Sequence, residues 1–289
     1  MKALNIPVGI SNFEKIRNNG FYYVDKTGLI EELLKTEAEV TLITRPRRFG
    51  KTLGMSMLES FFDIRKNSRK LFEGLEIARQ SELCSKWMNQ YPTVSVSFRQ
   101  VDGLNFTSAY DMLTMVFADL YNKHLYLLED SHVTEFQKKT FTNIAHGCGS
   151  EKEVKSSLVL LTTMMQQHYG KAVVLLIDEY DVPVAKASNH GYYNEMLDIM
   201  KGIMSTALKD NQALRFAVIT GCLKIAKESI FTGTNNFVSD TIRDSRYNEY
   251  FGFTQTEVDK ILNDSGCIEH AENVREWYDG YHFGEVDVY

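Results

Sequence analysis

The chain has 289 residues, with 44% hydrophobic and 24% charged side chains, an ordinary composition for a soluble globular protein with a substantial core. Its net charge of −6 gives no global attraction toward nucleic acids or anionic membrane surfaces. No run of about 18 apolar residues exists, and residues 1–5 lack the apolar segment of a signal peptide, so we expect a cytoplasmic protein without a membrane partner.

The cysteines and histidines form no recognisable metal site. The four cysteines show no C-x-x-C spacing, and the seven histidines are scattered along the chain. Structural metal is therefore not expected, and buried, reduced thiols are the simplest interpretation. The cysteines are Cys84, Cys148, Cys222 and Cys267.

A short extended segment at residues 21–24 is the first predicted element, and helical spacing of apolar residues continues after it up to Leu34. Asp25 or Thr27 is the expected N-cap of this helix. Residues 40–44 then form an apolar, β-branched run that predicts a strand. The loop after this strand ends in Gly-Lys-Thr, and a helical pattern begins at once.

This strand, loop and helix have the layout of a phosphate-binding P-loop. Backbone N–H groups and the helix N-terminus cradle phosphates, Lys51 reaches the terminal phosphates, and the Thr52 hydroxyl can bind Mg²⁺. The general pattern G-x-x-x-x-G-K-[ST] has glycine where this chain has Arg45. The residues predicted to contact the nucleotide are Arg45, Pro46, Arg47, Arg48, Phe49, Gly50, Lys51, Thr52 and Leu53.

The arginines of this loop leave two interpretations open. They can replace backbone contacts to phosphate, or they can bind acidic side chains or a neighbouring subunit or domain. Because Pro46 biases Arg45 toward extended torsions, we expect Arg45 and Arg47 to share one side of the chain. Upstream of the loop, Tyr22 or Tyr23 can contact the adenine base, since residues just ahead of a P-loop strand often do.

Between the P-loop and the next motif the pattern predicts mostly helices. The apolar face of the first includes Leu53, Met57 and Phe61, and short helical pieces come after it within residues 72–87. Residues 93–98 alternate and predict a strand. A long amphipathic helix is then expected at 109–128, a more polar one at 135–144 and another helix at 154–165. This stretch is longer than a minimal P-loop core needs, so we expect a helical insertion around 100–150.

The second motif comes after residues 173–177, five apolar residues that predict a strand buried on both faces of a parallel sheet. Asp178 and Glu179 stand at its carboxyl end, where open α/β sheets place their chemistry. In a P-loop enzyme, Asp178 would hold Mg²⁺ and Glu179 would polarise a water molecule against the γ-phosphate. The simpler alternative is that the two acids only end the strand and cap the next segment.

After the acidic pair, residues 180–183 break the strand, a helix is predicted at 194–208, and a further buried strand covers 214–220. In NTPases that separate the P-loop strand from the acidic strand, an inserted strand ends in a polar residue that senses the γ-phosphate. Thr220 fits that role, although a plain strand end turned by Gly221 explains it equally well. Short polar segments begin at Lys224, and the S/T-x-x-E capping box of Thr254 and Glu257 predicts another helix. A last helical piece is expected at 272–278.

These residues together carry a resemblance to the bacterial AAA-ATPase-like family. It rests on the segments 24–27, 45–52, 176–181, 220–231, 250–254 and 277–284, and it runs from about Ile6 to the last residue. The Arg-Pro-Arg-Arg-Phe-Gly-Lys run is highly specific, so the resemblance implies that Arg45 is the family's own variant of the P-loop. Family members resemble P-loop ATPases with a helical or winged-helix lid, often followed by a PD-(D/E)XK nuclease-like domain.

The sequence thus predicts a three-layer α/β P-loop domain with a mostly parallel sheet over residues 1–235, and the beginning of a truncated helical lid over 236–289. We expect Mg²⁺–ATP binding and hydrolysis that drives a conformational change, with Lys51, Glu179 and Thr220 as catalytic residues and Thr52 and Asp178 as Mg²⁺ ligands. The alternatives are a non-hydrolysing nucleotide-binding switch and a phosphotransferase. A protein partner is expected, and a nucleic-acid partner only through a nuclease-like domain that these residues do not contain.

Overall fold

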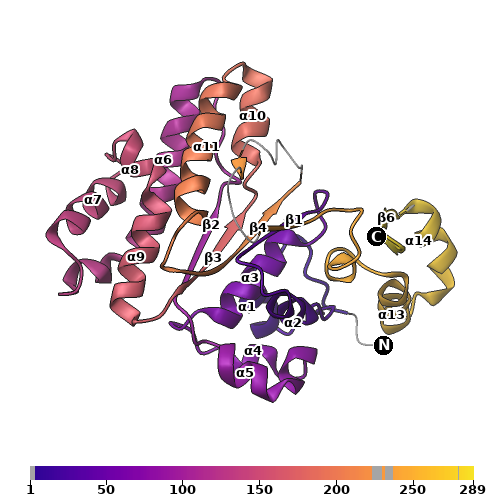
Figure 1. The fold of residues 1–289 in the computed structure, drawn as a ribbon. Helices are drawn as coiled ribbons and strands as arrows, with labels where there is room; N and C mark the ends of the chain where they lie inside the picture. Colours follow the sequence, from indigo (N-terminus) through magenta and orange to yellow (C-terminus); the bar gives the residue numbers. More distant parts are fainter. Residues whose placement is uncertain (1–3, 223–229, 232–236, 279) are drawn as a thin grey trace. The chain divides into compact units, whose positions relative to one another are not determined.

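The computed structural model describes residues 4–222, 230–231, 237–278 and 280–289. It shows an α/β fold with a five-stranded, mostly parallel sheet flanked by helices (Figure 1). This confirms the predicted α/β class and is consistent with a three-layer P-loop architecture. The strand order is β2–β3–β4–β1–β5. The strands are β1 Val40–Thr44, β2 Thr93–Ser97, β3 Val173–Asp178, β4 Leu214–Gly221 and β5 Phe237–Asp240.

The chain divides into two compact units. Unit 1 comprises Met1–Glu37, Thr44–Gln90 and Ser239–Tyr289, and unit 2 comprises Ala38–Ile43 and Tyr91–Val238. The predicted P-loop and the residues from Ser239 onward therefore fall in the same unit. The division at residue 235 stays a prediction, and residue 236, where the lid is predicted to begin, lies outside the described residues together with most of the polar stretch after Lys224.

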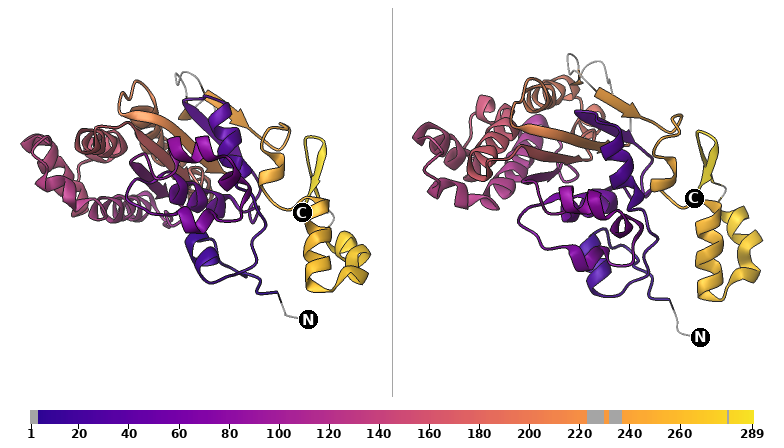
Figure 2. Two further views of the ribbon diagram at one scale, coloured as in Figure 1. Left: turned by 90° about the horizontal axis from the view of Figure 1, so that it is seen from below. Right: turned by 60° about the horizontal axis from the view of Figure 1, so that its bottom comes forward.

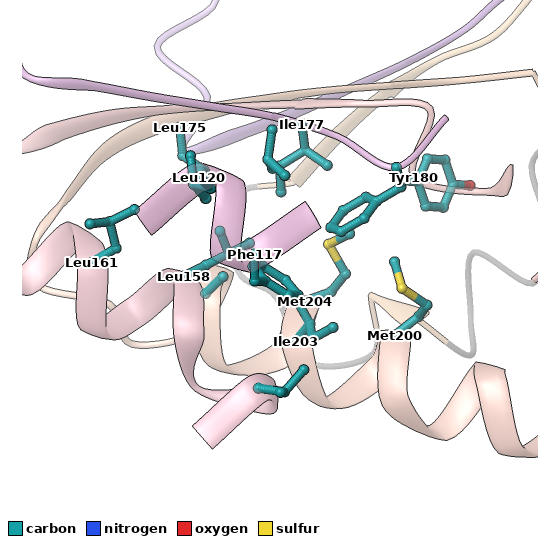
Figure 3. Packing of buried hydrophobic residues seen from close by; sticks show 14 of the residues in the cluster. Phe117, Leu120, Leu158, Leu161, Leu175, Ile177, Tyr180, Met200, Ile203 and Met204 are labelled. Atoms are coloured by element: carbon teal, nitrogen blue, oxygen red, sulfur yellow. The ribbon is translucent and has the colours of Figure 1, made fainter. Parts of the chain in front are cut away.

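Unit 2 is organised around β3, in which every residue is buried. β3 pairs in parallel with β2 and with β4, so that Ile177 lies opposite Val96 on one side and Ile219 on the other. Figure 3 shows Leu175 and Ile177 of β3 pointing toward apolar side chains of the helices, including Phe117 and Met204. Continuous apolar sequence is needed here because both faces of this strand are buried. The helical elements of unit 2 are α6 Phe106–Asn122, η2 Leu125–Glu129, α7 Glu135–Ala145, α8 Glu151–Lys155, α9 Ser157–Tyr169, α10 Val182–His190 and α11 Tyr193–Leu208.

Three helical regions in unit 2 differ from the sequence-based expectation. The helix expected at 154–165 is divided: α8 ends at Lys155 and α9 begins at Ser157, because the Ser156 backbone leaves helical torsions between them. α6 begins before residue 109, because Asn105 and Ser108 form a capping box that fixes the start of the helix. It ends at Asn122, and the 3₁₀ helix η2 takes up the rest of the predicted span. α10 is an unexpected helix: the sequence pattern predicts a break at Pro183, whereas this proline occupies the first turn of a helix, where its missing N–H costs nothing.

Unit 1 contains short helices packed through aromatic rings. Phe61 of α3 stacks edge-to-face on Phe62 and Phe72, and Phe72 also contacts Phe13 of α1. The helical elements are α1 Phe13–Asn18, α2 Gly28–Lys35, α3 Lys51–Phe62, α4 Arg69–Phe72, η1 Glu76–Arg79, α5 Ser81–Trp87, η3 Asn248–Tyr250, α13 Gln255–Ser265, η4 Ile268–His270 and α14 Ala271–Trp277.

The last part of unit 1 consists of α13, α14 and a small antiparallel hairpin, drawn in yellow in Figure 2. The hairpin strands are β6 Tyr281–Phe283 and β7 Val286–Val288. α13 starts at the predicted capping box, with the Thr254 side chain accepting from the Glu257 N–H and the Glu257 side chain accepting from the Thr254 N–H. At the start of α2, Thr27 is the N-cap residue, as one of the two expected candidates, but its side chain makes no cap bond. Asp25 instead accepts from the Thr27 N–H and hydroxyl.

The helices of the described part of the chain are short compared with a bilayer. α6 is the longest of them with 17 residues, whereas a membrane span needs about 20 predominantly apolar residues. None of these helices has both the length and the apolar character required to cross a membrane.

Candidate functional site

The loop between β1 and α3 turns at two residues with positive φ. Arg48 has φ 72°, and Gly50, the N-cap residue of α3, has φ 75°. This left-handed region is open to glycine and unfavourable for most other residues. Arg45 is not among the positive-φ residues. Its position therefore does not require the glycine of the general pattern, because the turn is made closer to α3.

Lys51, the first residue of α3, folds its side chain back over the loop. Its ammonium donates to the carbonyl oxygens of Arg45 at 2.9 Å and of Pro46 at 2.8 Å. Lys51 is buried, while Thr52 beside it is half-buried. The first N–H groups of any helix have no carbonyl acceptor within that helix, and the helix dipole makes its N-terminus positive. A lysine at this end is well placed to neutralise an anion.

Arg45 is fully buried, and its guanidinium points away from solvent into unit 1. It forms an ion pair with Asp240 at the end of β5 and donates to the side-chain oxygen of Asn248 at 3.2 Å. Of the two interpretations open for this residue, the structure therefore shows a bond to an acidic side chain. Arg47 is exposed, so Arg45 and Arg47 do not share one side of the chain as expected. Contact of the Arg45 backbone with nucleotide stays a prediction.

The other end of the loop is fixed by an aromatic residue. Phe49 is buried, and its ring centroid lies 5.0 Å from that of Tyr281 and 5.2 Å from that of Phe283. The Gly252 N–H donates to the Phe49 carbonyl at 3.2 Å. A side chain at Gly252 would collide with Phe49, since an added Cβ would lie 2.6 Å from its ring. The loop is thus fixed at Arg45 and at Phe49 by residues that lie at the end of β5 or after it.

A pocket of about 460 Å³ borders this loop within unit 1. Its lining is mainly apolar and comes from the N-terminal segment, the loop, α3 and residues from η3 onward. Tyr22 and Tyr23, the two residues expected near an adenine base, both line it. The loop, α3 and C-terminal lining residues are Arg48, Phe49, Gly50, Leu53, Gly54, Met57, Tyr250, Gly252, Phe253, Ile261 and Tyr289.

Two polar contacts join the N-terminal segment to α13 beside this pocket. The Lys26 ammonium forms an ion pair with Glu257 at 2.6 Å, and the Tyr22 hydroxyl donates to Asp264 at 2.8 Å. Burial lowers the pKa of Lys26, and Glu257 opposes that change. Burial, together with the Asp264 carboxylate, raises the pKa of Tyr22 to about 12. Sequence reasoning missed Lys26 as a pocket residue, although it lies inside one of the motifs of the family resemblance.

In unit 2, the ends of β3 and β4 bring Asp178 and Thr220 together. The Thr220 hydroxyl donates to the Asp178 carboxylate at 2.5 Å, and both residues are buried. The Tyr180 N–H donates to the Thr220 carbonyl at 3.1 Å, which ties the two strand ends through the backbone as well. β4 lies between β3 and β1 in the sheet. The expected order of an acidic strand, an inserted strand and the P-loop strand is confirmed.

The residues after Asp178 are held in a defined turn. Glu179 has φ 55°, a conformation that costs energy for a residue with a side chain and that is found often at functional sites. Asp181 is buried and accepts from the Cys222 N–H at 2.9 Å, so it links this turn to the end of β4. Asp181 lies inside the segment 176–181 of the family resemblance, but sequence reasoning gave it no role, because its contact with Cys222 joins distant parts of the chain.

The side-chain oxygens of the two predicted Mg²⁺ ligands, Thr52 and Asp178, are of the chemical type that Mg²⁺ prefers. This ion usually keeps several water molecules and is bound by one or two carboxylates plus substrate phosphates. The Asp178 carboxylate and the Thr52 hydroxyl are donors of that kind. Among the described residues, no group of three or more His, Cys, Asp or Glu side chains could hold a metal ion by itself. The four cysteines are free, but none is fully buried: Cys148 is exposed and the other three are half-buried, so the expectation of buried thiols is wrong.

Comparison with known proteins gives two matches. A family model described as "Predicted AAA-ATPase" matches residues 7–231. The chain is also 29% identical over 292 residues to a protein of Azotobacter chroococcum mcd 1 named "Uncharacterized protein in vnfD 5'region". That alignment covers 100% of this chain and 51% of the relative, so the chain spans about half of the relative's length. Residues 240–289, which hold both ends of the loop, lie beyond the family model.

Proposed function

Because the chain belongs to the family of predicted AAA-ATPases, we propose that it binds Mg²⁺–ATP and hydrolyses it to drive a conformational change. The observation that carries this proposal is the loop before α3, where Gly50 in the left-handed region leads directly into Lys51 at the helix N-terminus. Backbone N–H groups, the positive end of a helix and a lysine together form a site for phosphates.

Lys51 is the residue that supplies charge to the phosphates. In the structure its ammonium is held by two carbonyl oxygens of the same loop. Hydrogen bonds from an ammonium to a charged phosphate oxygen are stronger than those to a neutral carbonyl, so a bound triphosphate competes favourably for this side chain. The backbone of residues 45–53 completes the phosphate contacts.

The pocket in unit 1 takes the nucleobase and ribose. Its volume lies within the range of about 300–1,000 Å³ that is usual for small-molecule sites, and an apolar lining suits the faces of an uncharged base. Tyr22 or Tyr23 contacts the adenine ring in this proposal. The polar groups at the pocket, including Lys26, then provide the hydrogen bonds that orient the base.

Asp178, Glu179 and Thr220 provide the groups for hydrolysis. Bound Mg²⁺ would neutralise charge on the β- and γ-phosphates, and Thr52 and Asp178 are the residues that would hold it. Glu179 accepts a hydrogen bond from the attacking water and orients it toward the γ-phosphate. Thr220 fixes the orientation of the Asp178 carboxylate through its hydroxyl and is the proposed γ-phosphate sensor. A carboxylate next to the metal ligand favours attack by water over phosphoryl transfer to another acceptor.

Calorimetric titration of Mg²⁺–ATP into the wild type and two lysine variants tests the proposal. Lys51→Ala should lose at least about tenfold in affinity, roughly 1.4 kcal/mol, because it removes the positive charge that stands at the helix N-terminus. Lys35→Ala is the matched control: Lys35 is an exposed lysine on α2 of the same unit, and its removal should leave affinity unchanged. A wild type that binds no ATP, or a Lys51→Ala variant that binds as tightly as the wild type, would overturn the proposal.

A further inference from the structure

The Arg45 guanidinium lies in a site built almost entirely by residues from the end of β5 onward. One terminal nitrogen is paired with the Asp240 carboxylate and lies 3.2 Å from the Asn248 side-chain oxygen. The other donates to the Asp240 carbonyl at 3.4 Å. Asp240 and Asn248 are nearly as buried as Arg45 itself, with exposed fractions of 2% and 1%. All of these residues belong to unit 1.

Aromatic rings cover further sides of this site. The guanidinium carbon lies 5.6 Å from the ring centroid of Phe251 and 5.3 Å from that of Phe283, within the range of cation–π attraction. Asn248 donates to the Phe283 carbonyl at 2.6 Å, which fixes the acceptor that faces Arg45. The charge is therefore held by one carboxylate, one amide and two rings.

The Arg45 side chain also bonds to the backbone next to the carbonyl groups that accept from Lys51. The guanidinium donates to the Thr44 carbonyl at 2.9 Å, just before Arg45, and the Arg45 carbonyl itself accepts from the Lys51 ammonium. The path from Asp240 to Lys51 thus consists of one ion pair, the backbone of one residue and one hydrogen bond. Without this anchorage, the carbonyl groups that accept from Lys51 would be free to change direction.

We propose that Arg45 is a positioning residue for nucleotide binding, pinned by Asp240 so that the carbonyls of Arg45 and Pro46 hold Lys51 ready for phosphate. The segment after Ser239 is then a necessary part of the phosphate site, although it lies outside the family model that matches residues 7–231. This inference rests on the proposed function, since it names the residues that prepare the phosphate site for its ligand.

The energetics of a buried ion pair make this dependence strong. A buried charge that loses its partner is strongly unfavourable, because it has neither water nor an opposite charge to stabilise it. Replacing the Asp240 carboxylate by an amide of the same shape would leave the guanidinium uncompensated. The Arg45 side chain would move toward solvent and displace the Arg45 backbone. The carbonyl groups of Arg45 and Pro46, which accept from Lys51, would then move as well.

Asp240→Asn, Asp240→Glu and Asp63→Asn form the test set. Asp63→Asn is a matched control, because Asp63 is a buried carboxylate of unit 1 that is paired with Arg65 at 2.7 Å and takes no part in the loop. Asp240→Asn should weaken Mg²⁺–ATP binding by at least about tenfold, whereas Asp240→Glu, which keeps the charge, and Asp63→Asn should each stay within about threefold of the wild type. Hydrogen exchange without nucleotide provides a second measurement. The backbone amides of residues 51–54 should exchange faster in Asp240→Asn than in the wild type, and at the wild-type rate in Asp63→Asn.

The outcomes separate this inference from the proposed function. Equal ATP affinity in Asp240→Asn and Asp63→Asn, or unchanged exchange at residues 51–54 in Asp240→Asn, would overturn the role of Arg45. If Asp240→Asn does not fold, Asn248→Ala, which removes the other side-chain acceptor of Arg45, takes its place. Faster exchange at 51–54 in that variant than in Asp63→Asn supports the role, and identical exchange contradicts it. A wild type that binds no ATP defeats the proposed function, while the exchange comparison still decides whether Asp240 orders the loop.

Discussion

Single residues of the predicted P-loop explain why position 45 of this chain does not require the first glycine of the general pattern. The left-handed torsions are at Arg48 and Gly50, whereas Arg45 stays outside that region and its side chain enters the buried site around Asp240. A glycine at position 45 would remove the guanidinium and would also enlarge the conformational freedom of the unfolded chain. The arginine therefore contributes to the folded loop through its side chain as well as through its backbone.

Arg45→Gly should lower the free energy of unfolding by about 3 kcal/mol, because it leaves the Asp240 carboxylate buried without its partner. It should not improve ATP affinity, although it restores the general P-loop pattern. Urea denaturation and ATP titration of the single variant measure both quantities. A double variant that also carries Asp240→Ala should recover part of the lost stability, since the uncompensated charge is removed. A clear gain in ATP affinity in the single variant would show that Arg45 contributes nothing to the site.

A substitution at Glu179 tests whether the protein is an enzyme or a nucleotide-binding switch. Glu179→Gln should leave ATP affinity nearly intact, while single-turnover hydrolysis falls by roughly 10²-fold or more, the usual effect of removing a positioned base. Glu195→Gln, an exposed position at the start of α11, is the control and should hydrolyse ATP like the wild type. An equally slow rate in all three proteins would favour the switch, and loss of ATP binding in Glu179→Gln would assign Glu179 a structural or metal-binding role.

Among the secondary-structure elements, those with a strong local pattern were predictable. The buried strand β3, the capping box of α13 and the position of β4 between β3 and β1 are all explained by apolar runs, cap residues or the order of the motifs along the chain. α10 was not predictable, because a proline early in a segment is compatible with either a break or a helix start. The choice depends on packing, which local sequence does not contain.

The residues of the candidate site stay predictions, and the structure shows only which of them lie together. The lysine, the acidic pair and Thr220 stand in recognisable local contexts, and the bond between Thr220 and Asp178 joins two of them. The partner of Arg45 could not be predicted from the sequence, because Asp240 is 195 positions away along the chain and no periodicity relates the two residues. The same is true of Lys26 and Glu257, which are separated by 231 positions. Sequence patterns identify groups with chemistry, whereas long-range folding decides which of them meet.

The junction between η2 and α7 predicts how the stability of the protein depends on pH. Asp130 accepts from the His132 N–H at 2.7 Å and from the His168 ring of α9, which ties the junction to that helix. These hydrogen bonds, the His132 N–H first, lower the pKa of Asp130 from 3.8 to about 2. The carboxylate therefore contributes stability above pH 3.8 that is lost as the pH falls toward 2. The urea midpoint of Asp130→Asn should lie below that of the wild type at pH 7, and the difference should shrink as the pH falls below about 4. A difference that stays constant down to about pH 2 would contradict this assignment.

For the whole molecule, the predicted site residues are divided between the two compact units. Lys51, Thr52 and the apolar pocket belong to unit 1, whereas Asp178, Glu179 and Thr220 belong to unit 2. Under the proposed function, a single nucleotide would contact residues of both compact units. Such a ligand stabilises the state in which both parts contact it, by about 2.7 kcal/mol when its concentration is about a hundred times the dissociation constant. This is the physical basis on which ATP binding and hydrolysis would produce a conformational change.

Hydrogen exchange with and without saturating Mg²⁺–ATP measures this linkage directly. In the wild type, ATP should slow exchange both in the first turn of α3 and at the ends of β3 and β4. Asp178→Asn removes the carboxylate proposed to hold Mg²⁺, so protection should persist in α3 and disappear at the strand ends. Chelating Mg²⁺ in the wild type should give the same divided pattern, because Asp178 is proposed to hold the ion and would have no other link to the phosphates. Protection confined to unit 1 in the wild type with Mg²⁺ present would mean that the nucleotide engages unit 1 alone. Asp178 and Thr220 would then form a structural pair, and the coupling of hydrolysis to movement would have to be sought elsewhere in the chain.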